Sequence, residues 1–287
     1  MSGPAAILLL ILVGRARAAG DPTAKKIAGW AARGYSVKER LDRRVGAFPV
    51  SVVIYSPNSG EGDRLEAYVV AGGKAYLGYS HPGRNDRLEL DTTPAGRFSS
   101  LLGRGSALIA YHALLPALNS DTLEIVRYRD FRFRLAASFP EGRFVQDDGR
   151  VLVLARDLPL GRFLSVGCSD FGTVSRTAFR TRLYEIQDGR FREADARHPR
   201  IYDEEIARKQ AALARLRSDL QKNAGEYLGL SLSLYYDYAA LGRARQGWQK
   251  QGEFFRLPRA APAAVRACFS TMRADLRSRL GIPADWP

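Results

Sequence analysis

Residues that carry out chemistry are scarce in this sequence. Its 287 residues include two cysteines, two methionines and three histidines. The histidines, His81, His112 and His198, lie far apart and show none of the short spacings of metal ligands. The letters DFG at 170–172 match one kinase motif, but no glycine-rich or catalytic loop accompanies them. We therefore expect neither a metal site nor a cofactor.

Long apolar runs are also missing. The N-terminal run AAILLLILVG, residues 5–14, is shorter than the about 20 residues that a membrane-spanning helix needs. Ala16-Arg17-Ala18 follows it as a small-x-small cleavage pattern, although residues 1–6 hold no lysine or arginine. We predict a signal peptide at 1–18, an exported (periplasmic or extracellular) protein, and no transmembrane segment in the mature chain.

Acidic residues are outnumbered by basic ones. The chain holds 44 Lys and Arg against 30 Asp and Glu, a net charge of +14, without any block of five or six like charges. Such a surplus permits binding to nucleic acid, anionic lipid or an acidic wall polymer, and it also serves solubility. Because export conflicts with nucleic-acid binding, we expect an envelope protein or an anionic envelope polymer as the partner.

The two cysteines, Cys168 and Cys268, form an even pair in an oxidising compartment, which permits one disulfide. In the chain-entropy model, a bridge that closes a loop of about 100 residues is worth about 4.7 kcal/mol. Two separately buried thiols are the alternative.

Three similar segments point to an internal repeat: RLEAYVVAGGKAYLGYS (64–80), TLEIVRYRDFRFRLAAS (122–138) and TRLYEIQDGRFREAD (181–195). A shift of 58 aligns Leu65 with Leu123, and the same shift aligns Asp130 with Asp188. Each segment is typical of two short strands around a turn, which reads GGK, RDF or QDGR. The sequence therefore predicts three β-hairpins.

A further strand precedes each hairpin, and its copies align at a shift of 56. Positions 52–55 align with 108–111 and then with 164–167. The sequence thus predicts three units with a period of about 57, each with the order turn, strand, long loop and hairpin.

The pattern DLPLGRFLSVGC … RTRLYEIQDGRFREA resembles the FG-GAP/VCBS-type β-propeller repeat, and the resemblance covers about residues 37–195. It implies blade-like β units. The calcium loop of that family, Asp-x-Asp-x-Asp-Gly, is absent, and DDG at 147–149 does not replace it, so calcium binding is not implied. Three units are fewer than the four to eight blades of a closed propeller, which favours an incomplete or open propeller-like domain.

Six arginines flank the turns of the second and third hairpins: Arg127, Arg129, Arg132, Arg134, Arg190 and Arg192. Because side chains alternate along a strand, the arginines on each strand share a face, and Phe131 and Phe133 point to the other side, toward a core. The arginines are interpreted either as the solvated face of a half-buried sheet or as a ridge that binds phosphate or carboxylate.

The sequence period becomes helical after Asp195. Residues 202–223 place Ile206, Leu213, Leu216 and Leu220 on one stripe, which predicts an amphipathic helix. Residues 225–242 are apolar on nearly all sides and indicate a buried helix, although their partial alternation permits a strand. Residues 261–281 predict a third helix, which ends in a glycine stop signal of the Schellman kind.

One group of residues could carry out catalysis. The shift of 56 places Ser56, His112 and Cys168 at equivalent strand ends. If these ends converge, Cys168 could be a nucleophile, His112 its base and Asp170 the residue that orients the base. Strand ends also tolerate polar residues, and a bridge from Cys168 to Cys268 would remove the nucleophile.

The expected fold class is α+β, with an N-terminal propeller-like domain of three repeats and a C-terminal helical subdomain. The expected divisions are the signal peptide (1–18), an N-terminal segment (19–45), the β repeat domain (46–198) and the helical subdomain (199–287). The favoured function is a non-catalytic binding or structural role in the envelope or outside it. The alternative is a hydrolase that uses the cluster at the strand ends.

Overall fold

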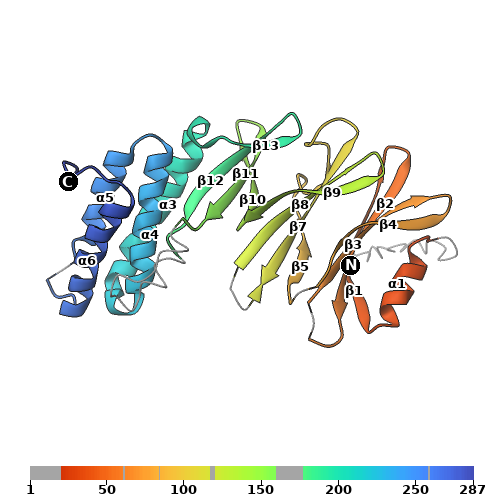
Figure 1. Ribbon diagram of the computed structural model, residues 1–287, viewed down its shortest axis with the longest axis horizontal. Coiled ribbons are helices and arrows are strands. Elements are labelled where there is room, and N and C mark those ends of the chain that lie inside the picture. Colours follow the sequence, from red (N-terminus) through yellow and green to blue (C-terminus); the bar gives the residue numbers. More distant parts are fainter. Residues whose placement is uncertain (1–20, 61, 84, 117–119, 160–176, 258) are drawn as a thin grey trace, which may run out of the picture. The chain divides into compact units, whose positions relative to one another are not determined.

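The computed structural model describes residues 21–60, 62–83, 85–116, 120–159, 177–257 and 259–287. Within these residues, 13 strands form three antiparallel sheets, and helices follow toward the C-terminus (Figure 1). The mixed α+β class predicted from the sequence is confirmed. No closed propeller is formed by the described strands. The chain divides into two compact units, residues 1–84 and 85–287.

The first unit contains the first sheet and a short helix. The sheet has the order β1 (Tyr35–Val45), β2 (Phe48–Pro57), β3 (Arg64–Ala71) and β4 (Lys74–His81). Helix α1 (Ala24–Ala31) packs Trp30 against the rings of Tyr35 and Tyr55. Strand β1, which lies in the predicted N-terminal segment 19–45, is thus an edge strand of this sheet.

The second unit contains the other two sheets. The second sheet has the order β5 (Arg87–Leu90), β7 (Ser106–Leu115), β8 (Ser120–Arg129) and β9 (Arg132–Pro140), and β6 (Arg97–Ser99) also pairs with β7. The third sheet has the order β10 (Arg143–Asp147), β11 (Arg150–Asp157), β12 (Arg180–Gln187) and β13 (Arg190–Glu193).

The three predicted hairpins are present as β3–β4, β8–β9 and β12–β13. Their turns, Gly72-Gly73, Asp130-Phe131 and Asp188-Gly189, follow one another at the predicted shift of 58. Both turn residues have positive φ in every case, which is the backbone of a type I′ hairpin turn. Glycine and aspartate adopt this conformation readily, so local chemistry favours the first and third turns, whereas Phe131 in the second turn has no such preference.

The first two sheets also share a β-bulge. The β3–β4 ladder shifts register between Ala67 and Tyr68, and the β8–β9 ladder shifts between Ile125 and Val126, which are the equivalent positions in the repeat alignment. A bulge adds one residue to one strand of a pair and bends it. The two hairpins therefore have the same irregularity at the same distance from their turns.

The strands that precede the hairpins need a correction. Val50 pairs with Val69 and Leu108 pairs with Arg127, so β2 and β7 also correspond at a shift of 58 rather than 56. In the third sheet the strand beside the hairpin is β11, which ends at Asp157. The predicted strand at 164–167 lies outside the described residues.

The core of the second unit is layered. Leu108, Ala110, Leu123 and Ile125 of the second sheet form one apolar cluster with Val153 and Ala155 of the third sheet. The opposite face of the third sheet places Leu152, Leu154 and Leu183 against Ile201 and Tyr202 of the helical region. Figure 1 shows the same succession from β7–β9 through β10–β12 to the helices.

Four α-helices end the chain: α3 (Pro199–Leu216), α4 (Leu220–Ala240), α5 (Ala244–Phe255) and α6 (Ala263–Arg279). The predicted helix 202–223 is confirmed for residues 202–216, but its continuation as a single helix is wrong, because a 3₁₀ turn at Arg217–Asp219 separates α3 from α4. The side chain of Asp219 accepts a hydrogen bond from the Lys222 amide and caps the new helix.

The segment 225–242 lies almost entirely within buried α4, so the helical interpretation is confirmed and the strand alternative is wrong. Helix α6 ends as predicted. Gly281 has φ +61°, and the amide of Ile282 donates to the carbonyl of Arg277, which is the Schellman pattern.

Candidate anion-binding site

Four of the six predicted arginines gather on one face of the second sheet. Arg127 of β8 pairs with Arg134 of β9, and Arg129 pairs with Arg132. Residues directly opposite in a ladder share a face, so all four guanidinium groups project from the same side of the hairpin. The sequence prediction of shared faces is confirmed for this hairpin.

The aromatic residues of the hairpin agree with the prediction only in part. Phe133 is buried on the opposite face, where its ring lies 4.8 Å from that of Tyr128. Phe131 was predicted to point toward the core, and this is wrong: it is the second turn residue, has φ +64° and is 55% exposed. A turn residue leaves the alternation of the strand, so the period-2 rule does not apply to it.

The arginines line a groove between two hairpin ends. Arg127, Arg129, Arg132 and Arg134, with Asp130, surround a hollow of about 440 Å³. An adjoining hollow of about 550 Å³ shares Arg127 and Arg134 and reaches the turn of the β12–β13 hairpin. Arg190, Phe191, Tyr184 and Phe139 line this second part. We call the combined hollow the arginine groove.

The charge in the arginine groove is largely unneutralised. Among the described residues, the only carboxylate paired with the four arginines is Asp130, which lies 3.3 Å from Nε of Arg129, and both side chains are exposed. Nε of Arg127 is buried and has no hydrogen-bond partner among the described residues. Guanidinium groups are donors only, so unused donors of this kind suit the oxygen atoms of phosphate or carboxylate.

The third hairpin contributes less than its sequence suggests. Arg190 and Arg192 are both exposed, and Arg190 lines the arginine groove. Arg192 pairs across the ladder with Glu185, on the face opposite Phe191, and does not line either hollow. The structure therefore brings together five of the six predicted arginines.

The predicted catalytic histidine is held by two carboxylates. Nδ1 of His112 lies 3.0 Å from both carboxylate oxygens of Asp121, and Nε2 lies 3.3 Å from Oδ2 of Asp91. The hydrogen bonds to Asp121 and then Asp91 raise the pKa of His112 to about 9, against the opposing effect of burial. An imidazolium with both nitrogens engaged is a poor general base near neutral pH.

The convergence of the proposed catalytic cluster stays a prediction. Cys168 and Asp170 lie outside the described residues. Ser56 belongs to the first unit, where its hydroxyl donates to Asp63 at 2.7 Å. By ladder register, His112 corresponds to Ile54, since Ile54 pairs with Leu65 and His112 pairs with Leu123.

The proposed disulfide also involves a residue outside the described ranges. Cys268 lies on α6 and packs against the apolar core of the helices. Its partner would be Cys168, so the bridge stays a prediction.

A second group of arginines, at the end of α5 and on α6, was not predicted from the sequence. Arg266, Arg273 and Arg277 line a hollow between these helices together with Arg256. Spacings of seven and four residues place the three α6 arginines on one face of the predicted helix 261–281, and this signal could have indicated them. Among the described residues, no group of three or more His, Cys, Asp or Glu side chains is arranged so that it could hold a metal ion.

Comparisons with known proteins give no assignment: no family model matches the chain, and no curated protein or solved structure matches it either. Within the described ranges, none of the helices has the length and apolar character needed to cross a membrane.

Proposed function

We propose that this protein is an exported, non-catalytic binding protein whose arginine groove holds an anionic polymer of the envelope. One observation supports the proposal. Arg127 faces Arg134 and Arg129 faces Arg132, and one exposed carboxylate lies beside these four arginines in the described part of the chain. Like charges opposite each other in a ladder are destabilising, and a bound anion would remove that repulsion.

A polymer suits the groove better than a single small anion. The arginines extend from the β8–β9 turn to Arg190 at the β12–β13 turn, and the hollow between them is open. A chain of phosphate or carboxylate groups can contact several guanidinium groups at once. The net charge of +14 adds a long-range attraction to such a chain.

We also propose that the sheets are degenerate tandem units of an incomplete propeller related to FG-GAP/VCBS repeats. Three features favour this: the common turn spacing, the shared bulge, and the equal register of Val50–Val69 and Leu108–Arg127. The helices cover the outer face of the third sheet, so no further blade could stack there.

The proposed export depends on the N-terminal sequence, which lies outside the described residues. It is consistent with a cationic protein that meets anionic envelope polymers. Mass spectrometry of the mature N-terminus after expression with an export pathway tests it: cleavage after Ala18 is the expected result, and an uncleaved chain would contradict it.

Binding of fluorescently labelled polyphosphate and polygalacturonate, measured by anisotropy, tests the proposed function. We expect Arg129→Gln/Arg132→Gln to weaken binding at least tenfold. The matched control, Arg215→Gln/Arg245→Gln, removes two exposed arginines from helices outside the arginine groove, and its affinity should stay within twofold of the wild type.

Two results would contradict the proposal. Equal losses in both double variants would show that net charge, rather than the groove, governs binding. An affinity for the polymers that does not fall as NaCl is raised would show that charge attraction does not hold them, since salt screens exposed charges. The two probes separate phosphate polymers from carboxylate polymers.

A further inference from the structure

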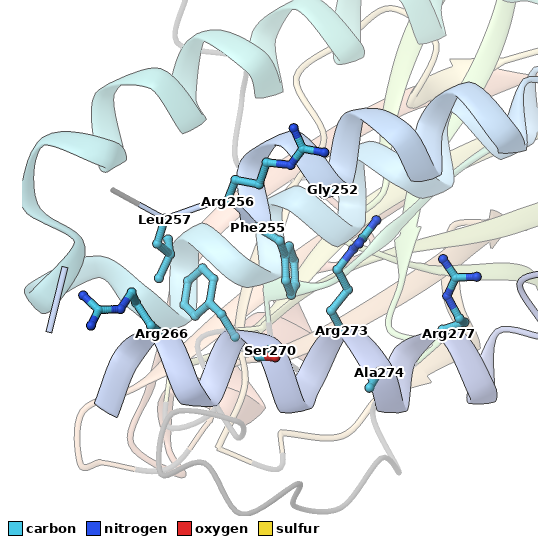
Figure 2. Close-up of a pocket in the computed structure, with 10 residues that line it drawn as sticks. Gly252, Phe255, Arg256, Leu257, Arg266, Ser270, Arg273, Ala274 and Arg277 are labelled. Atoms are coloured by element: carbon cyan, nitrogen blue, oxygen red, sulfur yellow. The ribbon is translucent and has the colours of Figure 1, made fainter. Parts of the chain in front are cut away.

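A second basic hollow lies in the helical part of the chain, between α5 and α6. Its volume is about 430 Å³, within the usual range for small-ligand sites. Figure 2 shows Arg256 at the end of α5 and Arg266, Arg273 and Arg277 along α6, with Phe255 between them. The remaining lining residues are Gly252, Leu257, Phe269, Ser270 and Ala274.

The four arginines have no Asp or Glu partner among the described residues. Arg277 donates to the carbonyl oxygens of residues 283, 284 and 286, and Arg273 donates to the backbone oxygen of Pro287. Arg266 likewise donates to the carbonyl oxygens of residues 259 and 261. These contacts orient the guanidinium groups without placing a side-chain anion beside them.

Arg273 lies in the positive potential of the neighbouring arginines, Arg277 and Arg256. Burial lowers the pKa of its guanidinium, and the nearby charges of Arg277 and Arg256 lower it further. Its Nε atom is buried and has no hydrogen-bond partner among the described residues. The guanidinium lies 4.9 Å from the ring centre of Trp248, which fixes its position by a cation–π contact. An anion in the hollow would relieve the repulsion.

The floor of the hollow is apolar. The rings of Phe255 and Phe269 pack against each other at 5.4 Å, and both are buried. Leu257 and Ala274 add further apolar surface. A free inorganic anion would leave this surface unused, whereas a ligand with an apolar body would cover it.

We propose that this hollow binds a small amphiphilic anion. Its phosphate or carboxylate head would lie between Arg256 and Arg273, with Arg266 adding positive charge at the far end of the hollow, and its apolar body would lie on Phe255 and Phe269. The site is independent of the arginine groove, because it is formed by helices alone and by different residues.

Isothermal titration calorimetry with octyl phosphate and octanoate, both below their micelle concentrations, tests the proposal. We expect one site, and at least tenfold weaker binding of inorganic phosphate. Arg256→Gln/Arg266→Gln should weaken binding of the octyl anions at least tenfold, since both side chains are exposed and their loss leaves the helix core intact. Arg215→Gln/Arg245→Gln is the matched control and should bind within twofold of the wild type.

A second variant separates loss of the binding site from a general loss of structure. Ser270→Glu places a carboxylate at an exposed position inside the hollow. This carboxylate should abolish binding of both octyl anions while circular dichroism stays unchanged. Because the site is separate from the arginine groove, Arg129→Gln/Arg132→Gln should keep full affinity for octyl phosphate even if polyphosphate binding fails.

Four results would overturn the proposal. The first is that neither octyl anion binds. The second and third are that neutral octyl glucoside or inorganic phosphate binds as tightly as the octyl anions. The fourth is that the Arg256/Arg266 double variant binds the octyl anions as tightly as the wild type. Octyl phosphate and octanoate together show whether the preferred head is phosphate or carboxylate.

Discussion

Arg127 on β8 lies directly opposite Arg134 on β9, with no carboxylate between them in the described part of the chain. The apolar residues that precede Arg127 on the same face, Leu123 and Ile125, pack against the third sheet. The face that forms the core between two sheets therefore becomes a cationic surface at its end. Burial of Leu123 and Ile125 stabilises the packing of the two sheets, whereas repulsion between the facing arginines destabilises the end of the hairpin.

Replacing Arg134 by threonine should stabilise the protein at low ionic strength. Arg134 is exposed, and threonine favours a strand, so the main effect is loss of repulsion with Arg127. We expect a gain of about 0.5 kcal/mol, in the range of cross-strand pairs. Thermal unfolding in 10 and 500 mM NaCl measures it: the gain should shrink at high salt. A loss of stability that is equal at both salt concentrations would contradict the repulsion.

Because of His112, the protein should lose stability as the pH rises from neutral to alkaline. Its folded pKa of about 9 exceeds the ordinary value of 6.5, so its contribution is complete below about pH 6.5 and is lost as pH rises through 9. We expect His112→Gln to cost about 2–3 kcal/mol at pH 6 and almost nothing at pH 10. Urea unfolding of both proteins across this range measures the difference. A constant difference would show that packing, not charge, is the contribution of His112.

Lys209 and Asp237 form a buried ion pair, so the effect of replacing one on the free energy of unfolding should depend on whether the other is present. Nζ lies 2.5 Å from Oδ2, and both side chains are at most 1% exposed. Lys209→Met leaves a buried carboxylate unpaired and should cost about 3–5 kcal/mol. Lys209→Met/Asp237→Leu should recover most of that loss. A double-mutant cycle by urea unfolding measures the coupling, and additive losses would contradict a paired charge.

Local chemistry made the hairpins predictable. Gly72-Gly73 and Asp188-Gly189 are strong turn signals, and the strands beside them alternate regularly. The strand beside the third hairpin was not found, because β11 ends at Asp157 and β12 begins only at Arg180. A connection of this length breaks the period on which the repeat alignment depends.

Helix α5 was not predicted from the sequence. Gly247 and Gly252 lie inside it, and glycine weakens a helical pattern. The structure explains their presence by close packing: a Cβ atom at Gly247 would lie 2.5 Å from Cβ of Tyr238, and one at Gly252 would lie 2.5 Å from Arg273. Tertiary packing, which a single sequence does not reveal, outweighs local propensity here.

The candidate site was predictable only as a set of residues. Alternation shows that Arg127 and Arg129 share a face, and the hairpin signal places the next strand opposite them, but neither gives the exact register that faces Arg127 with Arg134. Nor does it show that, in the described part of the chain, Asp130 is the only carboxylate paired with the groove arginines. The contribution of Arg190 to the same groove depends on how the second and third sheets pack together, which a single sequence does not reveal.

Arginine footprinting tests the central claim most directly. The protein is treated with phenylglyoxal with and without polyphosphate, and modification is quantified by mass spectrometry. We expect polyphosphate to protect Arg129, Arg132 and Arg134 at least fivefold and to leave exposed Arg215 unchanged. Equal protection of Arg215 and the groove arginines would contradict a defined site for an anionic polymer.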